Sequence, residues 1–233
     1  MEAFRFKQFS VNHEDAAFKV GTDSVLLGAW VRGEGIDRIL DIGTGSGLLA
    51  LMMAQRFGNA EIDAVEIDEA SALEAKLNFE QSRWSERLHL IHADFATYKV
   101  DNPYELIVSN PPFFQNDLLS GDARKDQARH GQQLPLEMLI QRSAEILSEN
   151  GKLSLVMPAD LLPRIEALLP AKGLAINRLC KVFPKPTKDW NRVLLEISRN
   201  AGRNEIEELT IRDQQGDYSP DYKKLTAEFY PAF

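Results

Sequence analysis

The feature that most constrains the fold is a regular alternation of short apolar runs and helical patterns along most of the chain. Apolar runs of strand length occur at 38–42, 60–66, 88–92, 104–109 and 152–157. Between them, apolar residues recur every three or four positions, as in a helix, at 48–57, 69–81 and 136–147. Strands that alternate with helices build βαβ units. The sequence therefore predicts an α/β protein with a mostly parallel sheet and helices on both faces.

The C-terminal part of the chain departs from this alternation. The strand-like runs 174–183 and 192–198 flank a Pro-rich loop, which predicts an antiparallel hairpin beside the parallel strands. With this hairpin we expect a seven-stranded sheet. Residues 205–213 are a candidate for one more edge strand, and 222–230 for a terminal helix.

The length of 233 residues suits one domain with a full core. We expect this single domain, 1–233, to consist of a helical N-terminal preface at 1–35, a core at 36–200 and a C-terminal extension at 201–233.

Residues that start and stop helices refine two boundaries. Thr22 or Asp23 is a candidate cap for a helix in the preface. Both could instead close over a ligand. Gly151 lies just past the third predicted helix, where a glycine is expected to end the helix and permit the turn into the next strand.

Composition excludes several protein classes. Hydrophobic residues make up 44% and charged residues 27%, which are globular proportions. One cysteine, Cys180, excludes a disulfide framework and a zinc site with several thiolates. His89 and His92 point to opposite faces of a strand, so we expect no metal site. Without an apolar run long enough to cross a bilayer, or an apolar signal core, we expect a cytoplasmic protein and no membrane partner. We also expect a monomer.

The net charge of −8 argues against nucleic acid as a partner, but the charge is unevenly distributed. The stretch 178–203 holds seven basic and two acidic residues, a balance of +5, so the rest of the chain carries −13. Phosphate binding requires local cations rather than a basic total. We therefore take Lys185, Lys188 and Arg192, in and beside the hairpin loop, as candidate substrate-binding residues.

A glycine-rich turn follows the first predicted core strand. Asp41 precedes Gly43, Gly45 and Gly47, and these glycines permit a tight turn and a close backbone approach to a ligand. The spacing G-x-G-x-G differs from the G-x-G-x-x-G of dinucleotide sites, and no P-loop lysine follows. The acid before the turn disfavours a pyrophosphate and favours a cationic ligand.

Two further acids end the next two strands. Glu66 is in the position that binds both hydroxyls of a ribose in doubly wound folds. We expect Asp94 to accept from an adenine amino group, while the next residue, Phe95, covers the face of the ring. The carboxyl ends of parallel strands face one crevice, where such sheets bind ligands. A ligand with an adenosine body, no pyrophosphate and a positive charge is expected there, which describes S-adenosylmethionine.

The fourth strand ends in Asn110-Pro111-Pro112-Phe113-Phe114. Two prolines remove two backbone donors and force an extended path. The Asn110 side-chain oxygen and a backbone carbonyl are thereby held as adjacent acceptors beside an aromatic ring. Such a pair suits an –NH₂ group, which has two N–H donors.

These motifs resemble those of the Rossmann-like class I methyltransferases that use S-adenosylmethionine to methylate amino groups. With the segment 18–30 and the tail through Arg192-Val-Leu-Leu-Glu196, the chain is similar to the bacterial tRNA(Val) adenine-N6 methyltransferase family over nearly its whole length. The resemblance implies methylation of the adenosine 3′ of the anticodon in tRNA. It implies catalytic roles for Asn110, Pro111, Pro112 and Phe113. It also implies that Phe113, where the family often has Tyr, stacks on the target base together with Phe114.

Other functions with the same chemistry stay open at this point. Guanine N2 or adenine N6 in ribosomal RNA, and glutamine N5 in a protein, present similar amino groups. The loop 124–130 is polar and basic, and it is either a substrate-contacting loop or plain surface. A nicotinamide-dependent oxidoreductase would need space for a pyrophosphate, which Asp41 disfavours.

Overall fold

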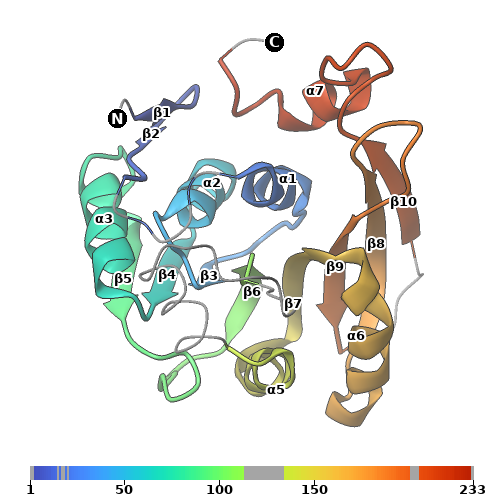
Figure 1. Ribbon diagram of the computed structural model, residues 1–233. Helices are drawn as coiled ribbons and strands as arrows, with labels where there is room; N and C mark the ends of the chain where they lie inside the picture. The colour runs from blue at the N-terminus through green and yellow to red at the C-terminus, as the bar shows by residue number, and fades with distance from the viewer. Residues whose placement is uncertain are drawn as a thin grey trace, which may run out of the picture.

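The computed structural model describes residues 3–14, 16, 19, 21–112, 134–199 and 205–231. These residues form an eight-stranded sheet in the order β10-β8-β9-β7-β6-β3-β4-β5 (Figure 1). The strands are β3 (Arg38–Ile42), β4 (Glu61–Glu66), β5 (Leu88–His92), β6 (Tyr104–Ser109), β7 (Leu147–Pro158), β8 (Ala175–Phe183), β9 (Arg192–Ser198) and β10 (Glu205–Thr210).

Helices cover both faces of the sheet. They are α1 (Thr22–Trp30), α2 (Leu48–Arg56), α3 (Glu69–Glu80), α5 (Leu136–Ile146), α6 (Leu162–Leu168) and α7 (Pro220–Thr226). Short 3-10 turns lie at Ser85–Arg87, Ala159–Leu161 and Pro170–Lys172. Figure 1 shows α1, α2 and α3 on one face, and α5 and α6 on the other. Of the helices in the described ranges, none is both long and apolar enough to cross a membrane.

The pairing of the strands confirms the predicted class I methyltransferase architecture. β5, β4, β3, β6 and β7 are parallel neighbours, and β9 runs antiparallel between β7 and β8. The sheet has eight strands rather than seven because β10 pairs in parallel with the outer strand β8. Alternate residues of the central strands enter two cores: Ile39 packs toward α2, while Leu40 packs on the face that α5 covers.

Three local features differ from the sequence predictions or were missed by them. The N-cap of α1 is Gly21, with no side-chain cap from Thr22 or Asp23. Gly151 does not end a helix: α5 ends at Ile146 and Gly151 lies within β7, where a Cβ atom would be 2.7 Å from the Tyr104 carbonyl oxygen. Close backbone packing explains this glycine. The preface also contains a small hairpin, β1 (Phe4–Arg5) with β2 (Ser10–Val11).

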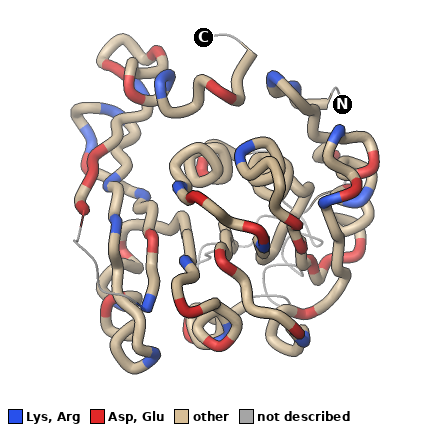
Figure 2. The backbone as a smooth tube through the Cα atoms, turned by 180° about the vertical axis from the view of Figure 1, so that it is seen from behind, with Lys and Arg blue, Asp and Glu red and all other residues tan. Residues whose placement is uncertain are grey.

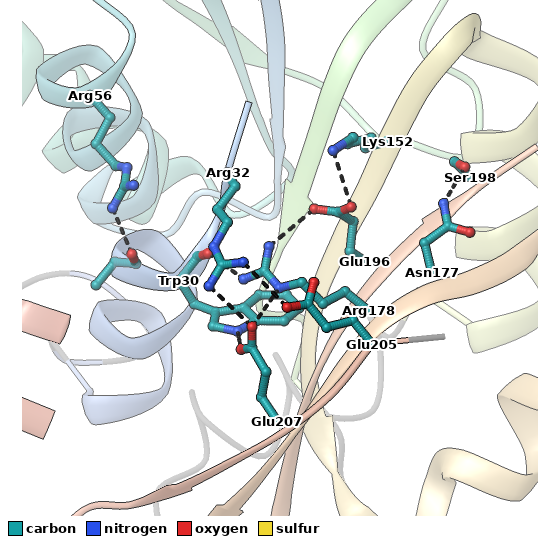
Figure 3. Close-up of polar contacts among 11 residues, drawn as sticks. Trp30, Arg32, Arg56, Lys152, Asn177, Arg178, Glu196, Ser198, Glu205 and Glu207 are labelled. Atoms are coloured by element: carbon teal, nitrogen blue, oxygen red, sulfur yellow. Dashed lines mark hydrogen bonds and ion pairs between the residues drawn. The ribbon is translucent and has the colours of Figure 1, made fainter. Parts of the chain in front are cut away.

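A buried arginine fixes the C-terminal end of α1 to the outer strands (Figure 3). Arg178 of β8 is 4% exposed, and its guanidinium lies 3.5 Å from the centre of the Trp30 ring. It donates to the Trp30 carbonyl oxygen at 2.7 Å and forms ion pairs with Glu196 and Glu207, each at 3.3 Å. Trp30 itself donates its indole N–H to Glu207 at 2.6 Å. One cation thus links α1, β9 and β10.

Replacing Arg178 should destabilise the protein strongly. Arg178→Ala leaves two carboxylates near the core without their buried partner, a change that costs about 3 kcal/mol or more. At about 2–4 °C per kcal/mol for a domain of this size, the midpoint of thermal unfolding should fall by about 6–12 °C. Circular dichroism during heating measures this midpoint.

Arg32→Ala is the matched control. Arg32 also pairs with Glu207, at 3.1 Å, but its side chain is 59% exposed. An exposed pair contributes less than about 1 kcal/mol. Equal losses of stability in the two variants would show that burial of Arg178 is unimportant.

Candidate active site

A cavity of about 780 Å³ opens at the carboxyl ends of β3, β4, β5 and β6. The cavity is lined by most of the residues that the sequence motifs predicted: the glycine-rich turn, the acids at the ends of the next two strands, and the Asn-Pro-Pro run. They are Gly43, Gly45, Glu66, Asp94, Phe95, Asn110, Pro111 and Pro112. Asp41 and Gly47 lie beside the cavity without lining it. Phe113 and Phe114 are outside the described residues.

The glycine-rich turn exposes its backbone to the cavity. Gly43, Gly45 and Gly47 have φ angles of 68°, 57° and 84°, which are accessible to glycine at little cost. A Cβ atom at Gly43 or Gly45 would meet nothing within 4 Å, so a ligand can approach the backbone there. At Gly47 it would lie 2.5 Å from the Phe79 ring. Gly47 therefore serves the packing of the turn against α3.

Asp41 lies beneath the turn rather than on the cavity wall. Its side chain is 0% exposed, and one oxygen, Oδ2, accepts from Thr44 Oγ1 at 2.6 Å and from the Ala50 N–H at 3.1 Å. Among the described residues, the other oxygen, Oδ1, has no hydrogen-bond partner. Burial raises the pKa of Asp41 to about 7, although these two bonds oppose the shift.

Glu66 ties the turn to the end of β4. Oε2 accepts from the Gly45 N–H at 2.8 Å, while Oε1 accepts from the N–H groups of Ile67 and Asp68, each at 2.9 Å. Burial raises the pKa of Glu66. A carboxylate has about four acceptor positions. Three backbone donors therefore leave Glu66 about one position for a ligand, fewer than the two ribose hydroxyls predicted from its position in the fold.

The end of β5 supplies a polar and an aromatic wall. Asp94 is exposed and accepts from the Ala96 N–H at 2.8 Å, whereas Phe95 is buried and still lines the cavity. The two residues therefore have the character predicted for contacts with an adenine ring and its amino group.

A serine that the motif analysis did not select holds Asn110. Asn110 Nδ2 donates to Ser24 Oγ on α1 at 2.9 Å, across 86 positions of the sequence. The strand end itself is fixed because Ser109 Oγ donates to the Ile42 carbonyl oxygen of β3 at 2.8 Å. With its nitrogen committed to Ser24, the amide of Asn110 keeps its oxygen as an acceptor. Nothing in the local sequence around Asn110 indicates a partner on a helix so far away in the chain.

The predicted basic residues fall into two places. Arg192 lines the cavity, and its Nε donates to Asp23 of α1 at 2.8 Å. Lys185 and Lys188 line a separate groove, which begins at Thr22. Acidic and basic residues are interspersed along the outer strands in Figure 2. Among the described residues of the basic stretch, Arg178 pairs with Glu196 and Arg192 pairs with Asp23. The charge segregation in the sequence is therefore weaker in the structure.

These features fit the site predicted from the sequence, which is one for a cationic adenosine derivative beside an acceptor of amino hydrogens. The open backbone at Gly43 and Gly45 leaves room for a ligand, and the acidic side chains of Asp41 and Glu66, in their ionised forms, would favour positive charge there. Asn110, at the end of the neighbouring strand, supplies an amide oxygen to the same cavity.

Comparison with known proteins places the chain in a family. Residues 16–169 match the family described as "Methyltransferase small domain". A tRNA1(Val) (adenine(37)-N6)-methyltransferase of Tolumonas auensis is 42% identical over 98% of this chain and 96% of its own length. A protein of the same name from Bacteroides thetaiotaomicron is also 42% identical, over 97% of this chain and 96% of its own.

Solved structures show the same fold. A predicted O-methyltransferase from Agrobacterium tumefaciens superposes with a TM-score of 0.67 at 21% identity, over 91% of this chain and 98% of its own. A ribosomal protein L11 methylase from Lactobacillus delbrueckii gives 0.54 at 23% identity, over 85% of this chain and 81% of its own. At these identities the likeness concerns the fold alone.

The raised pKa of Asp41 should make stability depend on pH. Between the ordinary value of 3.8 and about 7, the folded chain retains a proton that the unfolded chain has released. The contribution of Asp41 is therefore fully present below about pH 4 and is lost as the pH rises to about 7. Asp41→Asn keeps an oxygen for Thr44 and Ala50 but cannot ionise.

Urea unfolding of both forms at several pH values between about 4 and 8 tests this linkage. The free energy of unfolding of the wild type, minus that of Asp41→Asn, should fall with rising pH by at most about 1.4 kcal/mol per unit. A difference that stays constant, or that grows with pH, would contradict the assignment.

Proposed function

The chain belongs to the methyltransferase small domain family and, within it, to the family of the tRNA1(Val) (adenine(37)-N6)-methyltransferases, and we propose that it methylates the exocyclic N6 amine of an adenosine in tRNA. The target is the adenosine 3′ of the anticodon, at position 37 in the names of the relatives. The observation that carries this proposal is the position of Asn110, whose amide oxygen is an acceptor in the same cavity as the glycine-rich turn.

The residues of the cavity fit S-adenosylmethionine as the methyl donor. Gly43 and Gly45 would allow its backbone contact, and Phe95 and Asp94 would hold the adenine ring and its amino group. Glu66 has about one acceptor position left for a ribose hydroxyl. Asp41 would act from beneath the turn, because a cation nearby favours its ionised form. When bound, S-adenosylmethionine supplies a methyl group on a positively charged sulfur.

Asn110 would orient the amine of the target base. The amide oxygen and the Pro111 carbonyl each accept one amino hydrogen, which directs the nitrogen lone pair out of the ring plane and toward the methyl group. Holding two reactants in this way contributes up to about 7–11 kcal/mol in favourable cases. The same two acceptors stabilise the positive charge that develops on the amine. The protonated product amine is acidic enough to release its proton to water.

The remaining substrate contacts follow from the chemistry of an unpaired base. An adenosine must leave its stack before its amine can enter a cavity, and an aromatic ring stabilises the displaced base. We assign this stacking to Phe113, with Phe114 beside it. Arg192 at the cavity rim, together with Lys185 and Lys188, would bind the RNA backbone.

Nucleoside analysis tests the proposed reaction. The protein is incubated with bulk tRNA and labelled S-adenosylmethionine, and the RNA is digested to nucleosides. The label should appear in N6-methyladenosine. Asn110→Ala should reduce incorporation by about a hundredfold or more, as for the loss of one preorganised polar contact to a reacting group. Calorimetry should show unchanged cofactor binding.

Two outcomes would contradict the proposal. Label in N2-methylguanosine, or label in protein rather than tRNA, would assign another amino target. An Asn110→Ala variant that methylates at the wild-type rate would remove the catalytic assignment.

Ser24 is expected to act as a positioning residue through Asn110. Ser24→Ala removes the acceptor of the Asn110 N–H and frees the amide to rotate. One hydrogen bond contributes about 1 kcal/mol, so kcat should fall about fivefold to tenfold. The KM for tRNA and the affinity for the cofactor should stay unchanged. Ser24→Thr keeps the hydroxyl and should recover most of the rate.

Steady-state kinetics of both Ser24 variants provides the measurement. If Ser24→Thr is as slow as Ser24→Ala, the hydroxyl is not what positions Asn110. Changes confined to KM would likewise exclude this role.

A further inference from the structure

A second groove adjoins the active-site cavity, and the proposed function uses only its two lysines, Lys185 and Lys188, for contacts with the RNA backbone. It has a volume of about 610 Å³ and lies between the hairpin loop after β8 and the turn after β10. Thr22, at the start of α1, lines both the groove and the cavity. The groove therefore begins where the cavity ends.

Backbone hydrogen bonds hold the two walls of the groove together. The Ile211 N–H donates to the Phe183 carbonyl oxygen at 2.8 Å, and the Arg212 N–H donates to the Pro184 carbonyl oxygen at 3.2 Å. On the loop side, the Lys188 N–H donates to the Lys185 carbonyl oxygen at 3.1 Å. The groove is thus built on paired backbone segments.

The charge of the groove is positive. Lys185, Lys188 and Arg212 line it against one acidic residue of the described lining, Asp189. Within the described ranges, neither lysine forms an ion pair or a side-chain hydrogen bond, and no carboxylate pairs with Arg212. Cations without protein partners can neutralise phosphate groups.

The floor of the groove is suited to a flat ring. The Arg212 guanidinium lies 4.5 Å from the centre of the Tyr218 ring, and Tyr218 stacks on Tyr222 with ring centres 4.6 Å apart and an angle of 14°. Ile211 adds apolar surface. A guanidinium plane backed by an aromatic ring is a surface on which unpaired bases stack.

We propose that this groove binds a second unpaired nucleotide of the RNA, next to the adenosine that enters the cavity. Its base stacks against Arg212 and Ile211, and its phosphate contacts Lys185 and Lys188. The inference rests on the proposed function, because it requires a single-stranded RNA segment that runs from the cavity past Thr22. According to this inference, the substrate is an unpaired RNA loop, in which the target adenosine enters the cavity and an adjacent nucleotide enters the groove.

The closing experiment uses the full chain and a synthetic anticodon stem-loop of the tRNA. Methylation of this RNA by the wild type, read as N6-methyladenosine, first tests the proposed function alone. Binding of the same RNA is then measured at several salt concentrations for the wild type and for Lys185→Ala/Lys188→Ala. The double variant should bind about tenfold more weakly. The slope of log affinity against log salt should be smaller by about 1.4, as expected for two contacts to a single strand.

A matched control removes two exposed lysines at the opposite edge of the sheet. Lys76 lies on α3, and Lys99 follows β5. Lys76→Ala/Lys99→Ala changes the net charge equally and should leave affinity and salt slope near the wild-type values. Equal effects of both double variants would overturn the proposal, because net charge alone would then explain them.

Crosslinking locates the second nucleotide. Stem-loops with 5-iodouridine on one or the other side of the target adenosine are irradiated with the protein, and the attached peptide is sequenced. One of the two positions should crosslink to the segment 211–218. Arg212→Lys keeps the charge but removes the planar group, so the crosslink yield should fall while the salt slope stays the same. A methylated stem-loop with no crosslink to this segment would overturn the inference and leave the proposed function intact.

Discussion

Arg178 stacks on Trp30 at the C-terminal end of α1 and pairs with acidic residues of β9 and β10. At the other end of the same helix, Asp23 pairs with Arg192 of β9, and Ser24 accepts from Asn110. Helix α1 is therefore fixed at both ends to strands that follow the glycine-rich turn in the sequence: β8 at one end, and β9 and the end of β6 at the other. The orientation of the Asn110 amide, on which the proposed chemistry depends, follows from the position of this helix.

The turn between β3 and α2 combines two opposing requirements. Its glycines expose the backbone to the cavity, yet the loop must keep one shape. Asp41 and Glu66 provide that shape by accepting from donors in or next to the turn, and burial raises the pKa of both. In the proposed function, a sulfonium above the turn would favour the ionised forms of these two buried groups. Binding of the cation would therefore oppose the pKa shift that burial causes.

Much of this organisation could be predicted because it depends on local pattern. Strands 38–42, 88–92 and 104–109 lie where the apolar runs indicated, and the parallel sheet brings their carboxyl ends together. Contacts between distant segments could not be predicted in this way. Ser24 meets Asn110 only in the folded chain, and the spacing of the motif does not reveal whether Asp41 faces the ligand or the core.

A crystal structure with a non-reactive analogue of S-adenosylmethionine and the anticodon stem-loop tests the account most directly. The account predicts the adenosine N6 amine in the cavity, within about 3.2 Å of both Asn110 Oδ1 and the Pro111 carbonyl oxygen. It also predicts that the Ser24–Asn110 hydrogen bond persists in the complex. An amine bound elsewhere, or an Asn110 side chain turned away from the base, would contradict the account.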